Sequence, residues 1–200
     1  MPFQAVFFDL GGVIVRTEYE APRQHLAERL GMEYEDLTRA VFDSETARKA
    51  SIGLITEQDH WSAVMQRLGR PAADVESLRS EFFGGDVVDL GLVEFIRGLR
   101  PRFKTGLISN AWDGLRPYIL GQKFDDAFDF MLISAEVGVM KPETRIFQLA
   151  LEHAGVSANE AVFVDDMAEN VESARTLGMS AILFRDRDTT ITQLNNLIDK

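Results

Sequence analysis

Three aspartates and one lysine are the residues of this chain whose types and positions favour chemistry. Asp9 follows the apolar run "AVFF", and the pair Asp165-Asp166 follows the apolar run "AVFV". Lys141 lies in the stretch "GVMKPE". Carboxylates gathered in one place repel each other and raise each other's pKa. A divalent cation and a lysine would relieve that repulsion, and hard oxygen ligands of this kind suit Mg²⁺.

Ser109 and Asn110 add polar groups at the end of a further apolar run, "KTGLIS". Taken singly, each residue has an ordinary explanation, because acids, serine and asparagine suit turns and helix N-caps. Lys141 alone suits a solvated surface, and Pro142 suits the first turn of a helix. The order strand-Asp, strand-Ser-Asn, Lys-Pro, strand-Asp-Asp is harder to explain as four separate structural roles. We therefore interpret these residues as one site.

The elements that must position this site alternate along the chain. The expected strands are residues 5–9, 104–109, 129–134, 161–165 and 180–184. Between the later strands, apolar spacing near 3.6 predicts helices at roughly 89–100, 113–121, 143–155 and 168–177. Such alternation is typical of an α/β protein with a parallel sheet covered by helices on both faces.

The region from about residue 20 to residue 86 contains no competing strand-like run. Its patterns predict helices at 21–31, 34–48, 57–69 and 72–83. Thr56 is the expected N-cap of the third helix, and 157–160 and 190–193 fit capping boxes, the second opening a final helix. We expect an α/β core that is interrupted, after its first strand, by a helical insert.

Four stretches together resemble the motifs of the haloacid dehalogenase-like (HAD) hydrolase superfamily, over essentially the whole chain. They are "FFDLGGV" for motif I, usually written DxDx[TV], "GLISNAW" for motif II, "VGVMKPE" for motif III and "VFVDDMAEN" for motif IV. The resemblance implies a Rossmann-like parallel sheet in the order 5-4-1-2-3 with a small helical cap after motif I. We expect residues 1–15 and 88–200 to form the core and 16–87 the cap.

The strand order that this resemblance implies would bring the site together. Ligands of open parallel sheets bind at the carboxyl ends of the strands, where the strand order reverses. The resemblance implies that Asp9 attacks phosphorus as the nucleophile and forms an aspartyl-phosphate. It also implies that Mg²⁺ binds Asp9, Asp166 and the backbone carbonyl of Gly11, while Asp165 contributes through water or hydrogen bonds.

The remaining motif residues would handle the phosphoryl group. By the same resemblance, Ser109, the Asn110 backbone and Lys141 would hold the phosphoryl oxygens, and Lys141 would also be a catalytic residue. Asn170 would orient a water at the metal. The resemblance is closest to sugar-phosphatase-like members with an "FDLG" motif I, so we expect a Mg²⁺-dependent phosphatase of a small phosphorylated metabolite, with a sugar 1-phosphate as one candidate.

Position 11 departs from the superfamily pattern, because Gly11 stands where motif I has its second aspartate. In the superfamily that aspartate protonates the leaving group and then activates water, a contribution worth about 10²- to 10⁴-fold. Three interpretations stay open: a phosphatase without this acid, a metal-independent 2-haloacid dehalogenase with Asp9 as nucleophile, and a catalytically weak binding or regulatory protein. The two acids of motif IV favour the first, since dehalogenases of this superfamily use no metal.

Three residues are conceivable replacement acids. They are Glu18, which follows motif I, Asp113, which follows motif II, and His60 in the helical insert. Each also has a plain structural role: Glu18 as a solvated residue, Asp113 as a helix cap and His60 on an ordinary helix face. Phe42 and Phe82-Phe83 would either line a cleft between cap and core or pack in the core.

Composition limits the partners. The chain has a formal net charge of −11, which argues against nucleic acid and anionic membranes, because both need clustered Lys and Arg. It has no cysteine and therefore no thiolate chemistry. The N-terminal apolar run is too short to span a bilayer and lacks the features of a signal peptide. We expect a cytoplasmic protein that is a monomer or a small homo-oligomer.

Overall fold

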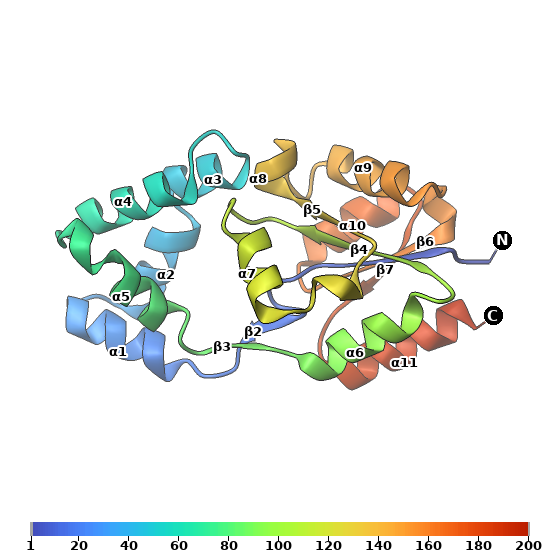
Figure 1. The fold of residues 1–200 in the computed structure, drawn as a ribbon, viewed down its shortest axis with the longest axis horizontal. Helices are drawn as coiled ribbons and strands as arrows, with labels where there is room; N and C mark the ends of the chain where they lie inside the picture. Colours follow the sequence, from blue (N-terminus) through green and yellow to red (C-terminus); the bar gives the residue numbers. More distant parts are fainter. Residues whose placement is uncertain (1, 200) are drawn as a thin grey trace.

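The computed structural model describes residues 2–199, and a five-stranded parallel sheet runs through it (Figure 1). The strands lie in the spatial order β5 (Phe130–Ile133), β4 (Lys104–Ser109), β1 (Ala5–Phe8), β6 (Ala161–Asp165) and β7 (Ser180–Leu183). All neighbouring pairs are parallel. Counted along the chain from β1 and read from the β7 edge, this is the order 5-4-1-2-3, so the predicted Rossmann-like sheet is confirmed.

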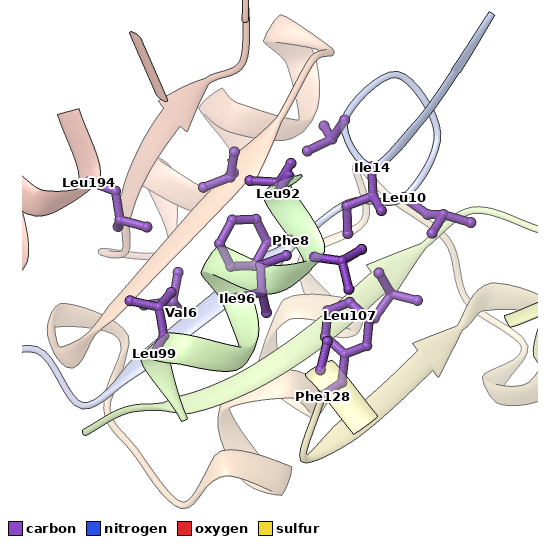
Figure 2. Close-up of a cluster of buried hydrophobic side chains, with 14 of the residues drawn as sticks. Val6, Phe8, Leu10, Ile14, Leu92, Ile96, Leu99, Leu107, Phe128 and Leu194 are labelled. Carbon is purple, nitrogen blue, oxygen red and sulfur yellow. The ribbon is translucent and has the colours of Figure 1, made fainter. Parts of the chain in front are cut away.

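The central strands are buried because helices cover both faces of the sheet. Side chains of β1 alternate between two hydrophobic clusters, Val6 and Phe8 on one face and Ala5 and Phe7 on the other. Figure 2 shows the first cluster, in which Phe8 lies among side chains from helices as well as strands. The helices of the Phe8 face are α6 (Leu90–Leu99), α7 (Leu115–Gln122) and α11 (Arg187–Ile198), and those of the opposite face are α9 (Thr144–Ala154) and α10 (Ala168–Thr176).

Five helices follow β1 and lie beyond the carboxyl ends of the central strands, at the left of Figure 1. They are α1 (Ala21–Leu30), α2 (Tyr34–Phe42), α3 (Glu45–Ser51), α4 (Glu57–Arg67) and α5 (Val75–Phe82), and we call residues 21–82 the helical segment. The segment has its own hydrophobic cluster, which includes Leu26, Val41 and Trp61. It is joined to the sheet by β2 (Val15–Thr17) and β3 (Asp86–Val88), which pair antiparallel.

The structure corrects several predicted elements of this region. The helix expected at 34–48 is two helices, because the Ser44 side chain accepts a hydrogen bond from the Ala47 N–H at 3.1 Å and caps a new helix. Strands β2 and β3 were not predicted, since three residues are too few for a periodic signal. Thr56 does cap α4, in a capping box with Asp59, as expected.

The two capping boxes expected later in the chain had different outcomes. Ser157 and Glu160 form one, at the short helix η3 (Ala158–Glu160). The prediction for Thr190 was wrong, because α11 already begins at Arg187 and Thr190 is buried within it. The N-cap of α11 is Asp186, whose carboxylate accepts the Thr189 N–H at 2.8 Å.

The remaining short helices lie in connections. They are η1 (Ala72–Asp74), η2 (Asp125–Ala127) and α8 (Ser134–Val137). Within residues 2–199, every helix falls short of the length and apolarity that crossing a membrane would require.

Candidate active site

Three carboxylates meet at the carboxyl edge of the sheet. Strands β1 and β6 pair in parallel with Phe8 opposite Val164, so Asp9 follows β1 at the level where Asp165 ends β6. Asp9, Asp165 and Asp166 each offer an oxygen within 4.8 Å of the others. The parallel register therefore brings together acids that are about 155 residues apart in the sequence.

Lys141 joins two of these acids. Its Nζ lies 2.8 Å from Asp9 Oδ1 and 2.7 Å from Asp165 Oδ2, and its side chain is only 1% exposed. A buried ammonium group is costly unless it is paired, so these two contacts fix where the lysine and both carboxylates lie. The structure places the predicted lysine inside the carboxylate cluster.

Asn110 holds the backbone of Lys141. Its side-chain amide donates to the Lys141 carbonyl at 2.8 Å, and its side-chain oxygen accepts the Lys141 N–H at 2.8 Å. This reciprocal pair connects the loop after β4 to the loop before α9. Ser109, the last residue of β4, is buried at the same sheet edge. The resemblance implies that the Asn110 backbone binds a phosphoryl oxygen, which stays a prediction, whereas the contact of its side chain with Lys141 was not predicted.

Asp165 is surrounded by donors. Besides Lys141, it accepts the Met167 N–H at 2.7 Å and the Asn170 side-chain amide at 3.1 Å to both oxygens. Asn170 Oδ1 is buried and has no hydrogen-bond partner among residues 2–199. Asp165 is thus a carboxylate whose orientation is set by the protein, and Asn170 keeps one acceptor unused beside it.

The other two acids have raised pKa values. Burial raises the pKa of Asp9 from 3.8 to about 7, with Lys141 opposing the rise and the charge of Asp165 adding to it. Burial and the charge of Asp165 also raise the pKa of the half-buried Asp166. With three carboxylates and one ammonium group, the ionised cluster has two uncompensated negative charges. One divalent cation would balance them, so the donor set and its charge fit Mg²⁺.

Two glycines next to Asp9 differ in what surrounds them. A Cβ added at Gly11 would meet no heavy atom within 4 Å, so the space that the superfamily aspartate would take is open. A Cβ at Gly12 would lie 2.1 Å from Asp166 Oδ2, and Gly12 has φ +74°. Gly12 was not predicted to be a site residue, although the pair Gly11-Gly12 is visible in the sequence.

The conceivable replacement acids are engaged elsewhere. Glu18 is exposed and lies 3.0 Å from Arg16 Nε. Asp113 accepts the backbone N–H of Glu57, the first residue of α4, at 2.8 Å. Asp113 is therefore a helix cap, as expected for its structural role. The helix that it caps is α4 of the helical segment, which lies more than fifty residues earlier in the sequence.

His60 lies in the interior of the helical segment and not on an ordinary helix face. It is fully buried, its Nδ1 lies 2.9 Å from Thr46 Oγ1, and its ring centroid is 4.6 Å from that of Trp112. Burial lowers the pKa of His60. A fully buried histidine packed against Trp112 in this way is a core residue.

The parallel sheet, the acids at its carboxyl edge and the helical segment after β1 define a Rossmann-like α/β protein with a candidate active site at the strand ends. The chain belongs to the haloacid dehalogenase-like hydrolase family, whose model matches residues 3–178.

Relatives agree with this assignment. The chain is 25% identical to the sesquiterpene phosphatase astK of Aspergillus oryzae over 201 residues, which are 98% of this chain and 97% of that protein. It is also 25% identical to bifunctional epoxide hydrolase 2 of Rattus norvegicus over 217 residues, 98% of this chain. The chain spans 39% of the length of that larger protein.

The fold is shared with a solved structure. The HAD family enzyme bt-2542 of Bacteroides thetaiotaomicron, in complex with magnesium and inorganic phosphate, superposes with a TM-score of 0.79. The two chains are 21% identical, and the match covers 94% of this chain and 98% of the other.

Proposed function

We propose that this protein is a Mg²⁺-dependent phosphatase that hydrolyses a small phosphorylated metabolite, with Asp9 as the nucleophile. One observation carries the proposal: Asp9, Asp165 and Asp166 cluster at the carboxyl edge of the sheet, and the buried Lys141 pairs with the first two. A metal-independent dehalogenase has no use for two further acids beside its nucleophile. The similarity to a sesquiterpene phosphatase also supports a phosphatase, and the magnesium and phosphate bound by bt-2542 support a site for both.

The reaction balances in two displacements. An oxygen of Asp9 attacks phosphorus, and the bond from phosphorus to the leaving oxygen breaks as the aspartyl-phosphate forms. The leaving oxygen takes its proton from solvent, because position 11 has no side chain to supply one. Water then attacks phosphorus, the bond to Asp9 breaks, and inorganic phosphate leaves. Lys141 keeps the attacking carboxylate in place by its contact with Asp9 at 2.8 Å.

The other residues of the proposed site would bind Mg²⁺ and the phosphoryl oxygens and would balance their charges. Asp9, Asp166 and the Gly11 carbonyl would hold Mg²⁺, which would supply positive charge to the phosphoryl oxygens. Ser109, the Asn110 backbone and Lys141 would bind those oxygens, while Asp165 orients Lys141. A leaving group that tolerates negative charge suits a site without an acid at position 11. The anomeric oxygen of a sugar 1-phosphate is one such group.

The helical segment is the proposed cap. We propose that residues 16–87 form a cap domain over a core of residues 1–15 and 88–200. The separate hydrophobic cluster of the segment and its two-stranded connection support this division. A cap over the carboxyl edge would exclude water while the aspartyl-phosphate forms.

The experiment is a substrate screen with wild type and Asp9→Asn in Mg²⁺ and in EDTA. It uses metabolite phosphates, acetyl phosphate and 2-haloacids. We expect phosphate release that needs both Asp9 and Mg²⁺. Haloacid turnover that persists in EDTA would replace the proposal with a dehalogenase, and the absence of Asp9-dependent turnover on both panels would favour a binding protein.

A further inference from the structure

Phe42, the last residue of α2, differs from the aromatic residues around it. Its ring packs edge-on against Phe82 at 5.4 Å and against Phe83 at 6.2 Å. Phe42 nevertheless remains 44% exposed, whereas Phe82 is fully buried. The Arg23 guanidinium lies 4.1 Å from the ring centroid of Phe82 and 5.8 Å from that of Phe42, so it makes cation–π contacts with both rings. Phe42 thus presents an apolar ring that is packed against other aromatic rings and is still partly exposed.

Trp112 connects this surface to the active site. It lies in the loop after β4, two residues beyond Asn110, whose side chain holds Lys141. Its ring stacks on Phe42 with centroids 6.0 Å apart and an interplanar angle of 27°. Its Nε1–H donates to the Ala47 carbonyl at 3.3 Å. Phe42 is therefore on the side of the helical segment that contacts the loop after β4, which carries Asn110.

The chemistry gives the direction in which the substrate extends. Displacement at phosphorus proceeds in line, so the leaving group departs on the side opposite to the attacking Asp9 oxygen. Asp9 follows the carboxyl end of β1, and the helical segment lies beyond that end of the sheet (Figure 1). In the proposed reaction, the organic part of the substrate would therefore point toward the helical segment, and Phe42 of that segment contacts Trp112 of the loop after β4.

We infer that Phe42 and Trp112 form the binding surface for the leaving group, and that this group is aromatic. The inference rests on the proposed phosphatase function and names its substrate class: a phosphate monoester of a phenol-like alcohol. A flat aromatic ring can stack on Phe42, and its oxygen leaves as a stable anion. Because a phenol-like oxygen can leave as an anion, the reaction would need no strong proton donor at position 11, where Gly11 has no carboxylate.

The test compares two phosphates in Mg²⁺: 1-naphthyl phosphate, which has a flat aromatic leaving group, and acetyl phosphate, which has none. We expect Phe42→Ala to raise KM for 1-naphthyl phosphate about three- to tenfold, the range expected from the loss of one aromatic contact. Its KM for acetyl phosphate should change by a smaller factor than its KM for 1-naphthyl phosphate, because acetyl phosphate has no ring to stack. Trp112→Phe, which keeps an aromatic ring, should have a smaller effect.

The matched control is Leu54→Ala, which removes another exposed apolar side chain of the helical segment, 68% exposed and outside the Phe42 contacts. It should change neither KM. Phe42→Leu, with its melting temperature measured, separates loss of the ring from loss of folding. Equal changes in KM for both substrates, or none for naphthyl phosphate, would overturn the inference. Absence of Asp9-dependent turnover of both phosphates by wild type would instead overturn the phosphatase function itself.

Discussion

Asp113 accepts a hydrogen bond from the backbone N–H of Glu57 at 2.8 Å, across the junction between the loop after β4 and helix α4. The first N–H groups of a helix lack partners within the helix, and a carboxylate there also suits the helix dipole. The Glu57 side chain accepts the Trp61 indole N–H at 3.1 Å and pairs with Arg79. The loop that carries Asn110 is therefore tied to the helical segment.

Replacing Asp113 with alanine should loosen this junction. We expect Asp113→Ala to cost about 1 kcal/mol of stability, as loss of a helix cap does, and to lower kcat/KM for phosphate esters. Asp113→Asn keeps a side-chain oxygen that can accept the same N–H, so it should retain most of the stability and most of the kcat/KM of wild type. Thermal unfolding and steady-state kinetics on the two variants check this. If Asn and Ala behave alike, the hydrogen bond has no such role.

Charge repulsion at the site should make the metal-free protein less stable than it could be. Asp9→Asn removes one of three clustered negative charges and leaves Lys141 paired with Asp165, so its melting temperature without metal should exceed that of wild type. Mg²⁺ should stabilise wild type by about 2.7 kcal/mol at a free concentration of one hundred times Kd, and should stabilise Asp9→Asn less. Calorimetry with and without EDTA measures both. A wild type that Mg²⁺ does not stabilise would contradict the proposed metal site.

Acid should destabilise the protein at the N-terminus of α6, where Asp89 is the N-cap. Burial alone would raise the pKa of Asp89, but hydrogen bonds from the Leu92 N–H and from Arg16 and Arg187 outweigh it and lower the pKa below its ordinary 3.8. A lowered carboxyl pKa contributes stability that is complete above the unfolded value and is lost as the pH falls through the folded value. Wild type should therefore lose more stability below about pH 4 than Asp89→Asn, which still caps α6. Urea unfolding at a series of acid pH values decides this, and parallel curves would refute it.

Position 11 offers a direct test of the missing acid. Because a side chain at Gly11 meets open space, Gly11→Asp should fold normally and restore a proton donor near the leaving oxygen. The rate of wild type should then depend more steeply on the pKa of the leaving alcohol than the rate of Gly11→Asp. Aryl and alkyl phosphates measured under saturating Mg²⁺ give the two slopes. Identical slopes would mean that another group already supplies the proton.

The neighbouring glycine is the control for that experiment. Gly12→Ala should abolish most of the activity, because its Cβ would fall 2.1 Å from Asp166 Oδ2 and its φ of +74° strains any other residue. Gly11→Ala, one residue earlier, should leave wild-type activity nearly unchanged. Measuring kcat and Mg²⁺ affinity for both variants separates crowding of Asp166 from a general effect of side chains in this turn. Equal losses in both variants would count against the specific contact with Asp166.

Much of the sheet and the meeting of its strand ends could be predicted from the sequence. Apolar runs that end in Asp9, Ser109 and Asp165 mark the strand ends, and parallel pairing brings such ends to one edge whatever their distance along the chain. The approach of Lys141 to the acids followed from the resemblance and from charge. These features depend on local composition and on a small set of sheet topologies.

What the sequence did not predict depends on contacts between distant residues. Nothing near Asp113 in the sequence indicates that it caps a helix more than fifty residues earlier, at Glu57. The break at Ser44 is local, but the helical pattern of 34–48 continues across it, so only the side-chain cap reveals two helices. The closeness of Gly12 to Asp166 likewise exists only after β1 and β6 have paired.

The antiparallel pairing of β2 with β3 has a consequence for how this protein can be altered. Val15 lies opposite Val88 and Thr17 opposite Asp86, so the chain leaves for the helical segment and returns from it side by side. The separation of these two points is set by the strand pair and not by the length of what lies between them. We therefore expect that a helical segment of different length can start and end at the same two points without shifting the register of the sheet. Such an exchange should leave Asp9, Asp165 and Lys141 in place, provided that the new segment again contacts the loop that carries Asp113.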